Sequence, residues 1–246
     1  MKLMQKMQKL MKTGTKRNNM AKHRINTWLI SDPHWYHDKV IEFCDRPYKD
    51  MGEMLVVMRN NWNKLVGPDD TVICTGDMFM YASKPKMKEY MDSLNGRKIL
   101  VRGNHDQKPT VMKNCGFDFV CEDMTYIISG ERVTFSHYPF RQPIYKHVYF
   151  NMKHKLFKLL GLKGTWATKK YTHLKRPKNN GQFLVHGHTH SKNKVNGRMI
   201  HIGVDAWNYK PIPLHEIGNL ISEIKKNEKI SKFSYYLNTF KSYFGL

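Results

Sequence analysis

The sequence predicts an α/β fold: a two-sheet β-sandwich flanked by helices. Aliphatic and β-branched runs alternate with amphipathic helical stretches through the first half of the chain, which is typical of a sheet built with crossover connections. The second half contains more short strands and turns, which indicates a second sheet. A length of 246 residues is enough for one substantial core. We therefore expect one main domain with appendages.

The first half of the chain is expected to alternate strictly between strands and helices. Asp50 can cap the first long helix, with Glu53 in the capping-box position. Pro85 near the start and Asn95-Gly96 at the end delimit the second. The expected order is a strand over 27–31, a helix from residue 50 to about 66, a strand over 71–75, a helix over 83–94 and a strand over 98–102.

After Gly116 the sequence pattern changes to strands and turns. Residues 125–129 and 132–136 predict a hairpin around a Gly130-Glu131 turn. Two further strands are expected over 182–186 and 199–204. We expect these strands to form a second, largely antiparallel sheet.

The net charge of +22 is concentrated in two segments. Residues 1–24 hold eight Lys or Arg residues, residues 141–178 hold eleven, and neither segment contains Asp or Glu. The rest of the chain is nearly neutral, with 23 basic against 20 acidic residues. We therefore expect a flexible basic arm over 1–24 and a main domain over 25–218 that carries a basic insertion over 141–178. Met20, just before the first strand, offers an alternative translation start.

The end of the chain predicts a helix over 219–246 that docks on the body or on a partner. Its apolar residues repeat at helical spacing: Phe233, Tyr236, Leu237, Phe240 and Phe244. No apolar stretch approaches the roughly 18 to 20 residues that span a bilayer, and a signal peptide is not apparent. A cytoplasmic location is therefore expected.

The four cysteines form no C-x-x-C pair, so we expect reduced thiols that serve as small hydrophobic side chains.

Residue types that bind metals recur where the predicted strands end. Carboxylate, amide and imidazole groups suit Mn, Fe, Zn or Ni better than Ca or a thiolate-bound structural zinc. Two such ions about 3.5–4 Å apart can activate a bridging hydroxide and neutralise charge on a phosphoryl group. The segments, in order, are Asp32-Pro33-His34, Gly76-Asp77, Gly103-Asn104-His105-Asp106, Ser136-His137 and Gly187-His188-Thr189-His190.

The pattern predicts a two-metal hydrolytic site with Asp77 as the carboxylate that bridges both ions. His105 is expected to point toward the phosphate oxygens of a substrate. We call the expected ligands of one ion the first half-site: Asp32, His34 and His190. The expected ligands of the other ion form the second half-site: Asn104, His137 and His188.

These five segments, in this order, resemble the calcineurin-like metallophosphoesterase superfamily from about Thr27 to Pro213. The resemblance implies two divalent ions, with Mn²⁺ favoured and Fe, Zn, Ni or Mg as alternatives. It also implies that His105 stabilises the transition state or protonates the leaving oxygen, and that Asp106 orients it. The implied metal ligands are Asp32, His34, Asp77, Asn104, His137, His188 and His190.

Sequences next to these segments, such as Cys-Asp-Arg-Pro-Tyr at 44–48, resemble the small phosphoesterases of bacteriophages and bacteria. For a phage protein the expected location is the host cytoplasm. His37 and Arg46 are candidate contacts to a substrate phosphate, with a capping or surface role as the alternative. Asp205 and Trp207 are expected to hold the ligand loops by packing and hydrogen bonding.

The expected function is dinuclear metal-dependent hydrolysis of phosphate esters by a metal-bridging hydroxide, as a phosphodiesterase or phosphatase on nucleotides or nucleic acid. The basic insertion is anchored beside metal ligands, so it is either a clamp for a polyanionic substrate or a solvated loop. Its interleaved aromatic residues favour nucleic acid, because aromatic rings stack on bases while Lys and Arg hold phosphates. Two alternatives stay open: a protein phosphatase, and a nucleic-acid-binding or membrane-surface-binding protein that uses the fold as a scaffold.

Overall fold

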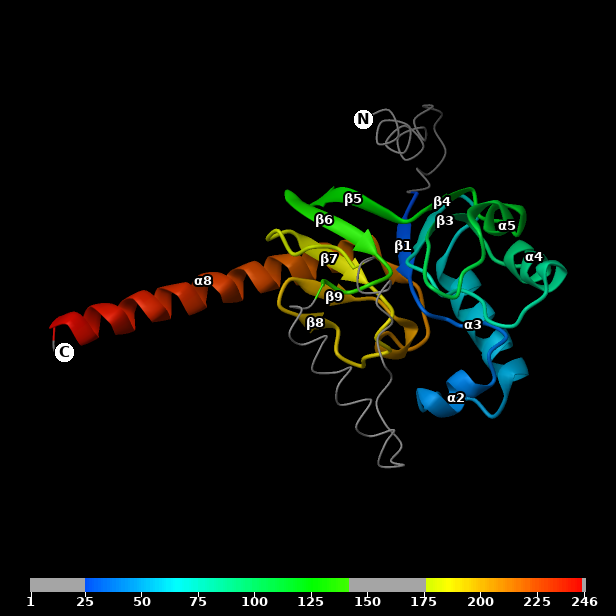
Figure 1. Ribbon diagram of the computed structural model, residues 1–246, viewed down its shortest axis with the longest axis horizontal. Coiled ribbons are helices and arrows are strands. Elements are labelled where there is room, and N and C mark those ends of the chain that lie inside the picture. Colours follow the sequence, from blue (N-terminus) through cyan, green and yellow to red (C-terminus); the bar gives the residue numbers. More distant parts are fainter. Residues whose placement is uncertain (1–24, 142–175, 245–246) are drawn as a thin grey trace, which may run out of the picture.

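The computed structural model describes residues 25–141 and 176–244, with side chains through Ser231. Two five-stranded sheets pack against each other with helices outside them, which confirms the predicted α/β sandwich (Figure 1). The basic arm, and residues 142–175 of the basic insertion, lie outside the described residues and stay predictions.

The first sheet places the early ligand loops along one edge. Its order is β10-β1-β2-β3-β4, with β1 to β4 parallel and β10 antiparallel to β1. Because parallel strands end on the same side, the loops that follow β1, β2 and β3 come together there. The strands are β1 Thr27–Ile30, β2 Thr71–Cys74, β3 Arg97–Val101, β4 Phe119–Cys121 and β10 Ile212–Pro213.

The two predicted helices, Met51–Leu65 and Lys84–Asp92, begin and end close to the expected positions, and two short helices that were not predicted accompany them. The Asp50 carboxylate accepts the Glu53 amide N–H at 2.8 Å, as expected of a cap. The Glu53 carboxylate accepts from the amide of Lys49, one residue before the cap, so the reciprocal bond is displaced by one position. The helices are α2 Lys39–Phe43, α3 Met51–Leu65, α4 Lys84–Asp92 and α5 Pro109–Asn114.

The second sheet is mixed, so the expectation of a largely antiparallel sheet was wrong. Its order is β5-β6-β7-β9-β8; β6–β7 and β7–β9 are parallel, and the two outer pairs are antiparallel. Neighbouring parallel strands need a long crossover connection. Residues 137–182 connect β6 to β7, and residues 187–198 connect β7 to β9. The strands are β5 Asp123–Ile128, β6 Glu131–Ser136, β7 Phe183–His186, β8 Val195–Asn196 and β9 Met199–His201.

Two local details of this half differ from the prediction. The β5–β6 turn lies at Ser129 and Gly130, whose φ angles of 51° and 77° suit a two-residue hairpin turn, one position earlier than expected. The strand expected to run to Val204 ends at His201 and is followed by a 3₁₀ turn, η1 Val204–Ala206.

Alternate residues of the central strands face two separate cores. On β2, Val72 and Cys74 point to the helix side, where they join Trp35 and Trp62. Ile73 points the other way, into the core between the two sheets. The same strands are thereby covered on both faces, which fixes the direction of the loops that follow them.

The last helix, α8, spans Leu214–Phe244 as one element that starts before residue 219 and extends away from the body (Figure 1). Lys225 pairs with Glu131, and Arg198 pairs with Glu228 at 2.6 Å. The aromatic residues expected on its far part lie beyond the described side chains.

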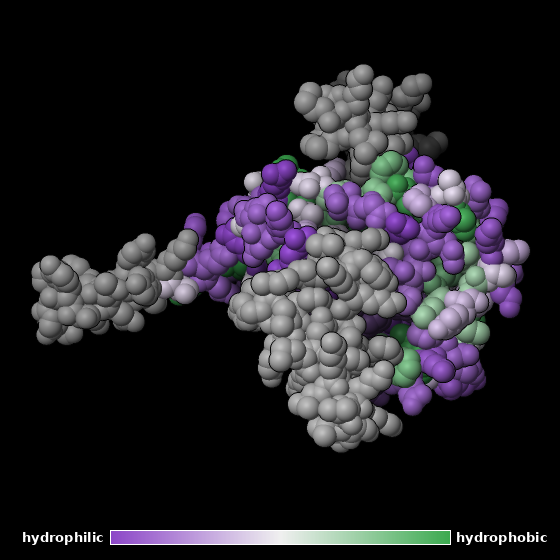
Figure 2. All heavy atoms as spheres, in the orientation of Figure 1, coloured by the Kyte–Doolittle hydropathy of each residue, from purple (hydrophilic) through white to green (hydrophobic). Residues whose placement is uncertain are grey.

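Within the described segments, every helix is too short or too polar to cross a bilayer. The described surface is mostly hydrophilic in the view of Figure 2.

Candidate metal centre

The structure brings the predicted ligands together at the edge where the strands end. In the first half-site, side-chain donor atoms of Asp32, His34 and His190 lie within 4.8 Å of one another. Around the second, donor atoms of Asp77, His137 and His188 do the same. The Asn104 side-chain oxygen lies 3.1 Å from His137 Nε2. All seven predicted ligands are therefore grouped as the sequence indicates.

Asp77 lies between the two half-sites. Its Oδ2 is 3.7 Å from His34 Nε2 and 3.3 Å from His137 Nε2. Its Oδ1 accepts the His105 amide N–H at 2.8 Å. One carboxylate oxygen is thus anchored by the backbone, while the other faces ring nitrogens from both half-sites.

Five of the seven candidate ligands lie in the left-handed backbone region. Because Asp, Asn and His tolerate this region better than most residues, these positions can be met without glycine. Such conformations cost on the order of 1–3 kcal/mol each and cluster at functional sites. The φ angles are 56° at Asp32, 49° at His34, 53° at Asp77, 69° at His188 and 49° at His190.

Two glycines permit the close approach of the ligand loops. A Cβ on Gly103 would lie 2.2 Å from Asp77 Oδ1. A Cβ on Gly187 would lie 2.2 Å from Asp32 Oδ2 and 2.0 Å from the Ser31 hydroxyl oxygen. Both contacts are far shorter than real Cβ contacts, so any side chain at either position would push the loops apart.

The donor set fits divalent cations. Both ring nitrogens of His34 are buried and have no hydrogen-bond partner. His137 Nε2 lies 3.0 Å from His188 Nδ1, so two imidazoles and the Asn104 oxygen converge on the same place. Buried polar atoms are normally paired, and a cation between them would supply the missing partner.

The electrostatics favour neutral imidazoles at two ligand positions. Burial lowers the pKa of His34 to about 2. Burial and the neighbouring His137 lower the pKa of His188 to about 3. Burial opposes charge on His137 as well, yet the carboxylates of Asp77 and Asp32 raise its pKa to about 9. His34 and His188 are therefore unprotonated at neutral pH, as a metal ligand must be.

An ion pair of buried side chains supports the first half-site. Asp205 Oδ2 contacts His190 Nδ1 at 2.8 Å, and Asp205 Oδ1 accepts from Arg46 Nε at 2.8 Å. The Arg46 guanidinium also donates to the carbonyls of Pro33 and Asp32 at 2.7 and 2.9 Å. The Arg46 side chain is fully buried, so this candidate substrate contact is committed to the ligand loops instead. Trp207 donates to the His201 carbonyl at 2.8 Å.

Asp106 ties two ligand loops together. Its carboxylate accepts the amide N–H groups of Asp77, Met78 and Gly103 at 2.8 to 2.9 Å. Burial and the nearby Asp77 charge raise its pKa to about 6. The resemblance implied that Asp106 orients His105; its described contacts are to these backbone amides, because the carboxylate turns inward between the loops.

His105 lies at the open side of the centre, whereas His37 is buried next to it. The His105 side chain is 39% exposed, and its Nε2 lies 3.9 Å from Asp77 Oδ2. The His37 ring is 5.8 Å from the His34 ring, and burial lowers the pKa of His37. The position of His105 therefore suits a group that meets a substrate, whereas the buried His37 packs beside His34.

Sequence reasoning missed Cys44 as a neighbour of the site. All four cysteines are free, as expected, but the Cys44 thiol lies in one group with His190 and Asp205. Its place in the Cys-Asp-Arg-Pro-Tyr segment was the available signal.

Comparisons with known proteins agree with this fold. The family model described as calcineurin-like phosphoesterase matches residues 25–202. An uncharacterized Methanocaldococcus jannaschii protein, MJ1445, is 36% identical over 97 residues, which cover 38% of this chain and 55% of that protein. The Gene 66 protein of Mycobacterium phage L5 is 29% identical over 219 residues, which cover 83% of this chain and 98% of the phage protein. The crystal structure of AQ665, a protein of unknown function from Aquifex aeolicus, has a TM-score of 0.56 and 26% identity, and the match covers 80% of this chain and 100% of that one.

Proposed function

This chain belongs to the calcineurin-like phosphoesterase family, and we propose that it hydrolyses phosphate esters with two divalent ions, as a phosphodiesterase or phosphatase on nucleotides or nucleic acid. The observation that carries this proposal is the position of Asp77 Oδ2, 3.7 and 3.3 Å from ring nitrogens of the two half-sites. A dinuclear centre needs one carboxylate at such a position.

The chain's own residues have distinct tasks in this reaction. The seven ligands would hold the ions, with Mn²⁺ favoured by the mixed oxygen and nitrogen donors. When bound, two such ions activate water as a nucleophile and neutralise phosphoryl charge. His105, exposed beside Asp77, donates a proton to the leaving oxygen or a hydrogen bond to the phosphoryl group. Asp106 fixes the loop that carries it.

A polyanionic substrate is supported by charge near the site. The Arg141 amide donates to the Pro177 carbonyl at 2.8 Å, so the insertion leaves and rejoins the fold at one place. Arg141 follows the ligand His137 by four positions. Residues 141–178 contain eleven basic residues and no acidic ones, which suits contact with phosphates along a nucleic acid strand.

The test is hydrolysis by purified protein loaded in turn with Mn²⁺, Fe²⁺, Zn²⁺, Ni²⁺ and Mg²⁺. The panel contains an aryl phosphodiester, an aryl phosphomonoester, mononucleotides, single-stranded nucleic acid and a phosphopeptide. We expect metal-dependent turnover of nucleotides or nucleic acid that is lost in Asp77→Asn and retained in Asp69→Asn, a matched change at an exposed turn. Protein that is inert with every metal would contradict phosphoesterase activity, and faster turnover of the phosphopeptide would favour the protein phosphatase.

A further inference from the structure

We propose that the substrate carries a planar nucleobase next to its scissile phosphate, and that Tyr81 and Phe43 bind this base at the mouth of the metal centre. The inference rests on the proposed phosphoester hydrolysis and specifies which part of the substrate is recognised. We call Tyr81, Phe43 and His37 the aromatic rim.

The aromatic rim combines high exposure with one location. Among the large hydrophobic side chains exposed in the described parts of the chain, Phe43 and Tyr81 are the aromatic ones, at 62% and 81% exposed. Both contact the same ring: His37 lies 6.3 Å from Phe43 and 5.5 Å from Tyr81 between ring centroids. Two exposed rings, one at the end of α2 and one on the loop after β2, thus meet around one histidine, whereas isolated exposed hydrophobic residues are usually scattered.

The aromatic rim adjoins the metal centre directly. The His37 ring is 5.8 Å from the ring of the ligand His34, which in turn is 5.4 Å from the ring of His105. A phosphate at the ligands would therefore place its attached sugar and base over the aromatic rim. Aromatic side chains stack on bases of any sequence, because every base presents a π face.

The backbone holds Tyr81 in its exposed position. Tyr81 has a φ of 62°, which is uncommon for a bulky residue and costs conformational energy. The ring gains little burial in return. The two residues before Tyr81 are tied to Trp35: Phe79 pairs with it in a β-bridge, and the Met80 amide donates to its carbonyl at 3.0 Å. Strain fixed in this way beside a reaction centre indicates a functional position.

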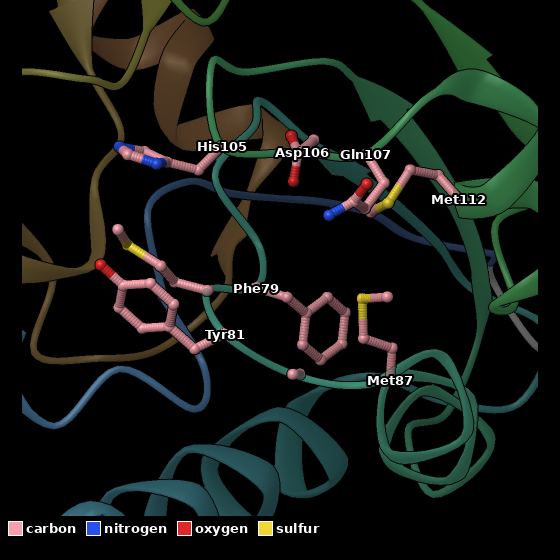
Figure 3. A pocket seen from close by; sticks show the side chains of 9 residues that line it. Phe79, Tyr81, Met87, His105, Asp106, Gln107 and Met112 are labelled. Atoms are coloured by element: carbon pink, nitrogen blue, oxygen red, sulfur yellow. The ribbon is translucent and has the colours of Figure 1, made fainter.

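A small cavity lies between the loop of Tyr81 and the loop of His105. Figure 3 shows the rings of His105 and Tyr81 extending to the same side of the cavity. The opposite side of the cavity is lined by Phe79, Met87 and Met112. The cavity is about 200 Å³, below the roughly 300–1,000 Å³ of sites for drug-sized ligands, so it suits one small ring system. The Gln107 amide lines it and can both donate to and accept from a base edge.

The experiment compares substrates and ligands that differ only in the base. Equilibrium binding of adenosine monophosphate and of ribose 5-phosphate is measured by calorimetry, and kcat/KM is measured for a dithymidine diester and its abasic analogue. The variants are Tyr81→Ala, Tyr81→Phe and Phe43→Ala, with Ile127→Ala as a control at an exposed apolar residue of β5.

We expect the wild-type protein to prefer the base-bearing compound of each pair by about tenfold or more, as base stacking predicts. The preference should fall toward unity in Tyr81→Ala, fall in part in Phe43→Ala, and persist in Tyr81→Phe and Ile127→Ala. The inference would be overturned if an active wild-type protein had equal affinity or equal kcat/KM for both compounds of a pair, or if Tyr81→Ala kept the wild-type preference. Either result would leave phosphoester hydrolysis standing. A stronger preference for a phosphotyrosine peptide over the dithymidine diester would also overturn it, whereas loss of hydrolysis on all compounds would count against the proposed function itself.

Discussion

The two half-sites are braced by different kinds of contact. The first half-site depends on side chains: Asp205 holds the ring of His190, and Arg46 links Asp205 to two carbonyls of the Asp32 loop. The second depends on one side chain, Asp106, and on main-chain groups. The Thr75 carbonyl lies 2.9 Å from His137 Nδ1, and Asp106 gathers three amides from the loops that carry Asp77 and Asn104.

This difference implies different vulnerabilities. An ion pair between residues 46 and 205 can be removed by a single substitution that leaves every ligand in place. In the second half-site a change at Asp106 would disturb the contacts to three amides, whereas the contact of the Thr75 carbonyl to His137 survives most side-chain changes. We therefore expect the first half-site to be separable from the second by mutation, with Asp77 as the point where they depend on each other.

The largest effect should come from Asp77→Asn, which weakens both half-sites at once. Losing several kcal/mol of charge stabilisation corresponds to roughly a 10³-fold fall in kcat/KM. Metal analysis after desalting should show reduced occupancy of both positions. If one ion stays bound with wild-type affinity, Asp77 does not serve the two half-sites jointly.

The next largest effect is expected for His105→Ala, which leaves both half-sites intact. Loss of a proton donor typically costs about 10²-fold or more in kcat. Metal content should equal that of the wild-type protein, because the anchoring contact of His105 to Asp77 is made by its amide. A matching loss of metal would show instead that the ring helps to hold the ions.

Asp205→Asn should act on the first half-site alone. Outer partners of metal-bound histidines usually contribute about 10- to 100-fold in affinity. Titration with Mn²⁺ should therefore reveal one weakened and one unchanged step. Glu216→Gln, a change at a half-buried residue on the first turn of α8, is the control. If both Mn²⁺-binding steps were weakened equally, the contacts of Asp205 would support both half-sites.

The smallest effect on metal binding is expected for Asp106→Asn. The amide replaces one acceptor oxygen with a donor, so at least one buried N–H loses its partner at a cost of roughly 1–3 kcal/mol. We expect thermal unfolding at a temperature lower by several degrees, with both metal-binding steps retained. Unchanged stability would mean that the loops are held by other contacts.

The grouping of the candidate ligands could be predicted from sequence because each stands at a strand end, where hydrophobic pattern and polar residue type change together. Asp205 was expected to hold the ligand loops, but its partner could not be predicted in the same way: Arg46 and Asp205 are 159 positions apart, and no local pattern links them. The sequence also does not show whether the Asp106 side chain faces His105 or the backbone amides of the neighbouring loops.

The fold shows the same limit. The alternation of strands and helices indicated the first sheet, since each crossover is encoded by adjacent elements. The directions in the second sheet depend on the link between β6 and β7, whose length, and not its hydrophobic pattern, permits a parallel pair. Short elements such as β10, with two residues, offer too few positions for any periodicity.

The left-handed backbone at five ligands has a practical consequence for dissecting the site. Alanine at His34 or His190 would remove the imidazole and would also tolerate the positive φ angle less well than histidine does, so two effects would be mixed. Glycine accepts the same φ without penalty. His34→Gly and His190→Gly therefore delete a donor with less disturbance of the loop, and free imidazole supplied in solution has room to take the vacated position as a chemical rescue.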